Sequence, residues 1–388
     1  INWGSSEKYN VKLTLDYHVQ KIVENVMDEN RISGAIVVED AATGDVLAMA
    51  SRPDFDQDSV EDYLDSRGNE LFNKATAAYN LGSVFKIIDI AALFENINKL
   101  DGKIRGEFSE SMFPGFSKYT DYDEANNNKN NDFDLSSAFD LDNYRCTGMV
   151  EINGLVFKCS SYFEGGHGLL NLEEAFAESC NSYFIEMCQK IGYRNLISTA
   201  QRFGFGAESG ITKQGVNEAK GSLPPLKAYY SRADIANISI GQGALLATPL
   251  QVADIVATIA NGGIKNKVNI VDSIVDDDGK TIRKIRNNQG QRIISVETAD
   301  RIRDLMEAVT SYGTGTEAGM DYFGGAGGKT GSAETGSEGV VHAWFAGYFP
   351  VKEPKYAIAV FVENGLYGGK AAAPLFAEIA RKMTDKGY

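Results

Sequence analysis

The chain has 388 residues, of which 53 are Asp or Glu and 38 are Lys or Arg, so its formal net charge is −15. This acidity disfavours nucleic-acid binding, which needs a basic face, and we expect no nucleic-acid partner. An apolar content of 43 % excludes a mainly disordered chain and allows a sizeable core. No apolar run approaches the roughly 18 residues that a membrane helix needs.

The start of the chain and its metal-binding residue types add three expectations. The chain begins at Ile1 without Met or a signal pattern, so we expect a fragment or processed product whose membrane anchor lies upstream. His18, His167 and His342 lie far apart, with no His-x-x-Glu-His or Cys-x-x-Cys spacing nearby, so no zinc site is expected. Four cysteines are too few for a disulfide scaffold.

The predicted elements begin with a connecting arm and an amphipathic helix within residues 1–30. Apolar residues recur there at helical spacing after the candidate cap Thr14. A β-hairpin follows, with apolar strands at 34–40 and 46–50 around a turn at 43–45.

The middle of the chain is predicted to be helical, and strands return near its end. Apolar residues recur every three or four positions in the segments 83–98, 172–191, 194–203, 248–260 and 296–309. A second hairpin is predicted from 342–349 and 356–363, and a final helix from 372–383. The Asn- and Asp-rich stretch 126–134 is interpreted as a solvated loop. Strands at both ends with helices between them predict an α/β fold, in which one sheet is built from distant segments and is interrupted by a helical lobe.

The first candidate for chemistry is Ser83, which follows Gly82 at the start of a predicted helix. Lys86 lies one turn on, on the same helix face. A neutral lysine there can take the serine hydroxyl proton, which gives a Ser–Lys nucleophile for acyl transfer. The alternative is that Ser83 is simply a helix N-cap. Ser-x-x-Lys alone does not decide, since about one or two matches are expected by chance in a chain of this length.

Two further motifs favour the catalytic interpretation. Ser179-Cys180-Asn181 is the only Ser-x-Asn in the chain, and Lys329-Thr330-Gly331 follows a glycine run and opens a predicted strand. In this order the three motifs are the signature set of penicillin-binding proteins and related β-lactamases. The sequence therefore resembles the transpeptidase domain of penicillin-binding proteins, most closely those of class B.

The resemblance extends almost continuously from about Thr14 to the C-terminus. Matching segments are 48–56, 165–168, 241–243, 248–251, 343–348 and 368–374. It implies a β-lactamase/transpeptidase-like fold, with an N-terminal arm and helix at 1–30 and a transpeptidase domain at 31–388. The helical lobe is expected at about 83–300. Departures at Asn80-Leu81, Val84 and Ser332 remove no reacting group but affect expectations of substrate preference and β-lactam sensitivity.

The resemblance also implies roles for the motif residues. Ser83 is expected to attack a D-Ala-D-Ala peptide with Lys86 as its general base. Ser179 is expected to relay a proton to the leaving amine, and Asn181 to orient Lys86. The remaining roles fall on the third motif: Lys329 and Thr330 hold the substrate carboxylate, Gly331 allows close approach of the strand, and the N–H groups of Ser83 and Ser332 form the oxyanion hole.

The expected partners are peptidoglycan stem peptides, β-lactam antibiotics and a glycosyltransferase or a membrane protein of division or elongation. We expect no cofactor and no metal, and a location on the extracytoplasmic face of a bacterial membrane. A β-lactamase would also need a base that positions water, and no segment clearly supplies one. A D,D-carboxypeptidase and a β-lactam sensor or silent division scaffold remain alternatives. Retention of all the reacting groups argues against a silent scaffold.

The cysteines and His167 are interpreted as structural. Cys146 and Cys159 flank the hairpin signal Asn153-Gly154, so they can form a disulfide or remain a pair of reduced buried thiols. His167 lies between glycines and is interpreted as a turn residue. Cys180 and Cys188 are interpreted as helix-core residues, and Trp344 and Tyr348 as packing on a sheet face.

Overall fold

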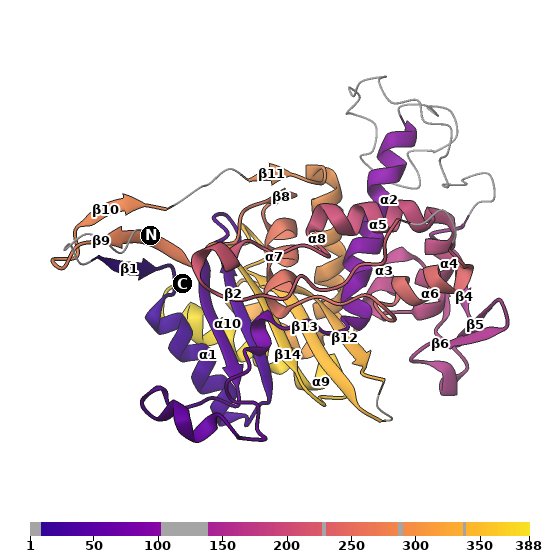
Figure 1. The fold of residues 1–388 in the computed structure, drawn as a ribbon. Helices are drawn as coiled ribbons and strands as arrows, with labels where there is room; N and C mark the ends of the chain where they lie inside the picture. The colour runs from indigo at the N-terminus through magenta and orange to yellow at the C-terminus, as the bar shows by residue number, and fades with distance from the viewer. Residues whose placement is uncertain (1–8, 102–138, 227–229, 286–289, 337–338) are drawn as a thin grey trace.

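The computed structural model describes residues 9–101, 139–226, 230–285, 290–336 and 339–388 (Figure 1). The Asn- and Asp-rich segment at 126–134 lies outside these residues. Among the helices of the described ranges, none combines the length and the apolar character needed to cross a membrane.

A five-stranded antiparallel sheet stands at the centre of the molecule, in the order β12-β13-β14-β2-β3 (Figure 1). Strand β14 pairs with β2, so that Tyr356 lies opposite Asp40 and Val362 opposite Gly34. This pairing joins the first and last hairpins of the chain and confirms the predicted sheet built from distant segments. The strands are β2 Gly34–Asp40, β3 Val46–Arg52, β12 Gly327–Glu334, β13 Val341–Phe349 and β14 Tyr356–Val362.

Helices cover both faces of this sheet, which explains why its strands are apolar on both sides. Ile36 and Val38 pack in one core with α1 (Tyr17–Glu29) and α10 (Ala373–Asp385). The alternate residues of β2 pack on the opposite face in the core that includes α7 (Pro249–Ala260). The buried residues of α1 belong to the same apolar core as one face of the sheet, so this helix packs as part of the sheet's domain. The proposed domain boundary at residue 31 stays a prediction.

The helical lobe lies at one end of the sheet, on the right of Figure 1. Its helices are α2 Lys86–Asp101, α3 Leu172–Ala177, α4 Asn181–Ile191, α5 Tyr193–Phe203 and α6 Arg232–Ser239. Helix α8 (Val296–Ser311) lies between the lobe and β12, and the short α9 (Gly368–Ala371) follows β14 and contacts β13.

Several small sheets accompany the main one. Two antiparallel strand pairs lie in the lobe, β4 Tyr144–Cys146 with β7 Gly168–Leu170 and β5 Met149–Ile152 with β6 Leu155–Lys158. The second pair confirms the hairpin signal at Asn153-Gly154. The others are β1 Asn10–Leu13 with β9 Val271–Val275 and β10 Thr281–Lys284, and β8 Ile264–Lys265 with β11 Gln291–Arg292.

Two predictions of helix boundaries are wrong, one for the helix at 172–191 and one for the N-cap of the first helix. The helix predicted at 172–191 is divided into α3 and α4, because Ser179 adopts a φ of 57° that no α-helix accommodates. The first helix is capped by the Asp16 carboxylate, which accepts from the N–H groups of His18 and Val19. Thr14 instead donates its hydroxyl proton to the carbonyl oxygen of Val46.

Candidate active site

Ser83 lies in a 3₁₀ helix, η3 (Gly82–Phe85), immediately before α2. The cap of this turn is Leu81, without a side-chain hydrogen bond, so the alternative that Ser83 merely caps a helix is wrong. The turn lies against strand β12, since a Cβ added at Gly82 would meet the Ser332 carbonyl oxygen at 2.3 Å. Gly82 also has a φ of 55°, which favours glycine. The backbone of Ser83 is thereby placed beside that of Ser332.

Lys86 begins α2 and is completely buried. Its Nζ donates to the Ser179 carbonyl oxygen at 2.7 Å, to Asn181 Oδ1 at 2.8 Å and to Ser179 Oγ at 3.3 Å. Burial disfavours the charged ammonium and lowers the pKa of Lys86 to about 8. About a tenth of the Lys86 amine is therefore neutral at pH 7, far more than for an ordinary lysine, and the neutral form can act as a general base.

Lys329, in strand β12, also approaches Ser179 and is likewise completely buried. Its Nζ donates to Ser179 Oγ at 2.9 Å and to the Thr330 carbonyl oxygen at 3.3 Å. Burial, together with the charge of Lys86, holds the pKa of Lys329 well below its usual value. The hydroxyl of Ser179 thus lies between two lysine amines, a placement suited to passing a proton.

The backbone between α3 and α4 explains how Ser179 reaches this position. The left-handed φ of 57° turns the chain out of α3 just before Cys180, which becomes the N-cap of α4. Such a conformation costs a residue other than glycine about 1–2 kcal/mol, so its surroundings must hold it. Two contacts at this bend hold Asn181: its side-chain amide donates to the Lys158 carbonyl oxygen at 3.0 Å, and its backbone N–H lies 3.2 Å from Cys159 Sγ.

The other residues of the third motif line the same strand. Thr330 shares a 2.6 Å hydroxyl–hydroxyl hydrogen bond with Thr314. A Cβ added at Gly331 would meet the Leu81 carbonyl oxygen at 2.6 Å, so glycine permits the close approach of β12 to η3. Ser332 is exposed, and its Oγ accepts from the Gly368 N–H at 3.4 Å.

Thr314 is a candidate site residue that the sequence analysis missed. It precedes Gly315 in the connection after α8, and no motif marks it. Only its contacts with Thr330 and with the Ala177 carbonyl oxygen reveal its place between the second and third motifs.

The prediction for Trp344 and Tyr348 is confirmed, since both are fully buried in strand β13. The interpretation of His167 and Cys180 was incomplete. His167 Nδ1 faces the sulfurs of Cys146 and Cys159. Cys180 is the N-cap of α4, with its sulfur 3.8 Å from that of Cys159, rather than a helix-interior residue. In the sequence, 12, 7 and 12 residues separate Cys146, Cys159, His167 and Cys180. These gaps match no compact metal-binding motif, so the sequence did not predict that the four side chains lie together.

Comparison with known proteins decides the family. The model of the penicillin binding protein transpeptidase domain matches residues 34–152 and 142–381. The chain belongs to this family. Class B penicillin-binding proteins are among its relatives: it is 31 % identical to stage V sporulation protein D of Bacillus subtilis over 96 % of its length. It is 30 % identical to the peptidoglycan D,D-transpeptidase PbpA of Mycolicibacterium smegmatis over 94 % of its length.

Solved transpeptidase structures share the fold of this family member. The imipenem acyl-enzyme complex of penicillin-binding protein A from M. tuberculosis has a TM-score of 0.77 at 25 % identity, covering 97 % of this chain and 80 % of that chain. The D,D-transpeptidase domain of an Eggerthella lenta peptidoglycan glycosyltransferase has a TM-score of 0.79 at 23 % identity, covering 100 % and 86 %. The chain spans 53 % of the length of the B. subtilis relative and 70 % of the M. smegmatis one.

Proposed function

We propose that the chain is the catalytic part of a peptidoglycan D,D-transpeptidase that works through a serine acyl-enzyme and is acylated by β-lactams. The observation that carries the proposal is the position of Ser179 Oγ, 2.9 Å from Lys329 Nζ and 3.3 Å from Lys86 Nζ. This arrangement brings the second and third motifs to the lysine one turn after Ser83. Membership of the transpeptidase family and a neighbour solved as an imipenem acyl-enzyme support it.

In the acylation step, Ser83 Oγ attacks the carbonyl carbon of the penultimate D-Ala while neutral Lys86 takes the hydroxyl proton. The oxygen that becomes negative accepts hydrogen bonds from the N–H groups of Ser83 and Ser332. The bond to the terminal D-Ala then breaks. Its amine receives a proton through Ser179, so that Lys86 is neutral again and an ester to Ser83 remains.

In the second step an amine of a neighbouring stem peptide attacks this ester and forms the cross-link. The same groups act in reverse: the amine loses a proton through Ser179 and Lys86, and the oxygen of Ser83 regains one. In the acylation step, Thr330 and Lys329 hold the terminal carboxylate of the donor, which then leaves with the released D-Ala. The arrival of that anion stabilises a charged Lys329, whose ammonium group is disfavoured by burial in its absence.

Two alternatives use much of the same geometry. A D,D-carboxypeptidase differs in using water as acceptor, and a β-lactam sensor acylates without acting on peptides. The proposed location is the extracytoplasmic face of a bacterial membrane, with a segment outside this chain as anchor. A glycosyltransferase or a membrane protein of elongation or division is the proposed partner, in keeping with the cell-wall function in the names of relatives.

Covalent labelling with a fluorescent penicillin tests the nucleophile. Ser83→Ala should abolish the label, whereas Ser198→Ala, on the exposed side of α5, should keep it. Continued labelling of folded Ser83→Ala would refute the assignment. Mass spectrometry of a D-Ala-D-Ala pentapeptide with an added amine then distinguishes the reactions. Cross-linked product supports the transpeptidase, release of D-Ala without it indicates a carboxypeptidase, and no release indicates a sensor.

A further inference from the structure

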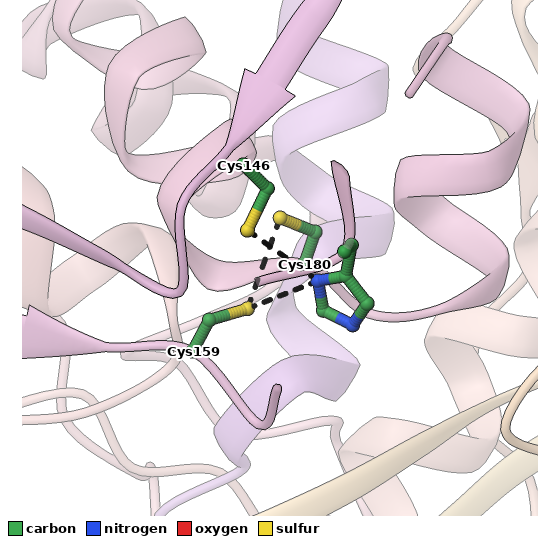
Figure 2. Close-up of side chains that lie close together, drawn as sticks. Cys146, Cys159 and Cys180 are labelled. Carbon is green, nitrogen blue, oxygen red and sulfur yellow. Dashed lines mark hydrogen bonds between the residues drawn. The ribbon is translucent and has the colours of Figure 1, made fainter. Parts of the chain in front are cut away.

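Four metal-ligand side chains converge beside the second motif, from four separate segments of the lobe. Cys146 ends β4, Cys159 follows β6, His167 precedes β7, and Cys180 caps α4 (Figure 2). Their ligand atoms all lie within 4.8 Å of one another. The three cysteines are buried and His167 is half-buried, so the group is screened from solvent.

Three distances within the group match the edges of a metal-centred tetrahedron. Zinc bonds of about 2.3 Å to sulfur and about 2.0 Å to nitrogen place two sulfurs about 3.8 Å apart and a sulfur about 3.5 Å from a nitrogen. Here Cys159 and Cys180 Sγ are 3.8 Å apart, and His167 Nδ1 lies 3.5 Å from Cys146 Sγ and 3.4 Å from Cys159 Sγ.

Hydrogen-bond donors around the sulfurs also suit thiolate ligands. Gly148 N–H lies 3.4 Å from Cys146 Sγ and Asn181 N–H 3.2 Å from Cys159 Sγ. The hydroxyl of Ser182 donates to Cys146 Sγ at 3.2 Å. Such donors orient thiolate ligands and stabilise their negative charge. Ser161 Oγ lies 3.0 Å from His167 Nδ1 and so must release that nitrogen when it coordinates a metal.

A disulfide explains this arrangement less well. One disulfide joins two sulfurs and has no use for a third thiol, although Figure 2 shows the sulfurs of all three cysteines directed toward one another, nor for the imidazole of His167 in the same group. All four cysteines are free, and Cys188, which is equally buried on α4, stands outside the group. Cys188 therefore provides an internal control for any effect of removing a buried thiol.

We propose that Cys146, Cys159, His167 and Cys180 bind one Zn²⁺ as a closed tetrahedral Cys₃His site. Three thiolates and one imidazole are a soft ligand set that suits this ion, and four protein ligands leave no open position for substrate. The metal is thus structural. This corrects the expectation of no zinc site, which rested on spacing along the sequence.

The site has a direct consequence for the second motif. Cys180 is the middle residue of this motif, and Cys159 accepts from the N–H of Asn181, so the ion would fix the two residues that directly follow Ser179. The neighbouring β5–β6 hairpin exposes Leu155 and Val156 and packs on α4 and α6 through a small apolar cluster around Ile152, so a metal bound by Cys159 would add a second anchor. The metal-ligand residues are therefore positioning residues for acylation, and this coupling rests on the proposed function.

Metal analysis of the purified chain tests the site without reference to activity. Elemental mass spectrometry should find about one zinc per chain, and Cys159→Ser and His167→Ala should each lose most of it. Cys188→Ala should keep it. Because a ligand variant can fail to fold, the wild-type chain loaded with Co²⁺ provides a second readout, with the thiolate charge-transfer and visible bands of a tetrahedral site.

The same samples separate the site from its coupling to catalysis. Removing zinc with a chelator should slow acylation by a fluorescent penicillin at least tenfold, and added zinc should restore it. A folded, reduced chain that binds neither zinc nor Co²⁺, or a Cys146–Cys159 disulfide in the native protein, would overturn the site. Unchanged acylation without zinc would overturn the coupling alone. Stoichiometric zinc in a chain that no β-lactam acylates would uphold the site and contradict the proposed function.

Discussion

Replacing Gly241 with alanine should disable the nucleophile turn while leaving the fold intact. Gly241 has a φ of 68°, and a Cβ added there would lie 1.9 Å from the Gly82 carbonyl oxygen. An ordinary contact begins at 3.4 Å, so the backbone preceding Ser83 must move by about 1.5 Å. A misplacement of about 1 Å in a catalytic group can cost on the order of 100-fold in rate. We therefore expect acylation to fall by about 100-fold or more.

Gly243 provides the matched control, two residues along the same segment. Its φ of 76° imposes a similar backbone strain on alanine, about 1–2 kcal/mol, but its nearest neighbour, Asn237 Cβ, is 3.7 Å from the added Cβ. Gly243→Ala should thus lose stability with little change in acylation.

The assay is the second-order rate constant for labelling by a fluorescent penicillin, with circular dichroism and thermal melting to verify folding. An acylation rate within threefold of wild type for Gly241→Ala would refute the reasoning. An equal loss for Gly243→Ala would also refute it, because strain rather than displacement would then explain the effect.

Lys86, Thr314 and Lys74 each give a further prediction. Because the neutral form of Lys86 is the base and its pKa is about 8, lowering the pH from 8 to 6 should reduce the acylation rate about 50-fold, and a flat profile would contradict this role. Thr314→Val removes the hydroxyl bonded to Thr330 and should weaken binding of a carboxylate-bearing β-lactam about fivefold, the effect of about 1 kcal/mol; unchanged saturation kinetics would exclude Thr314 from the site. The buried Lys74 Nζ lies 2.6 Å from a carboxylate oxygen of Glu363, and Lys74→Met removes this cation. Denaturant titration should then show a loss of about 3 kcal/mol in the free energy of unfolding. A loss below about 1 kcal/mol would show that solvent replaces the ion pair.

Most of the sheet and the main helices followed from local patterns. The strands at 34–40 and 356–362 are apolar runs bounded by turn residues, and the pairing of the two hairpins followed from a helical region placed between them. The break at Ser179 was missed because the apolar spacing of 172–191 continues through it. A left-handed φ at a serine leaves no trace in hydrophobic periodicity.

The sequence by itself determined the order of the three motifs, the residue types that can react, and the family they resemble. These are properties of single positions and of short spacings, which can be read directly from the sequence without knowledge of the fold. It also marked Lys86 and Lys329 as reacting groups, and the tertiary structure placed both amines within hydrogen-bond distance of the Ser179 hydroxyl.

Only the tertiary structure decided what lies next to what across long separations in the chain. It brought Thr314 to Thr330 and pressed Gly241 against the turn that holds Ser83. It also gathered three cysteines and a histidine from four segments into one buried group. Packing sets such distances through contacts that no residue spacing encodes. For that reason a chain with no zinc spacing in its sequence brings four potential metal ligands together beside its reacting groups.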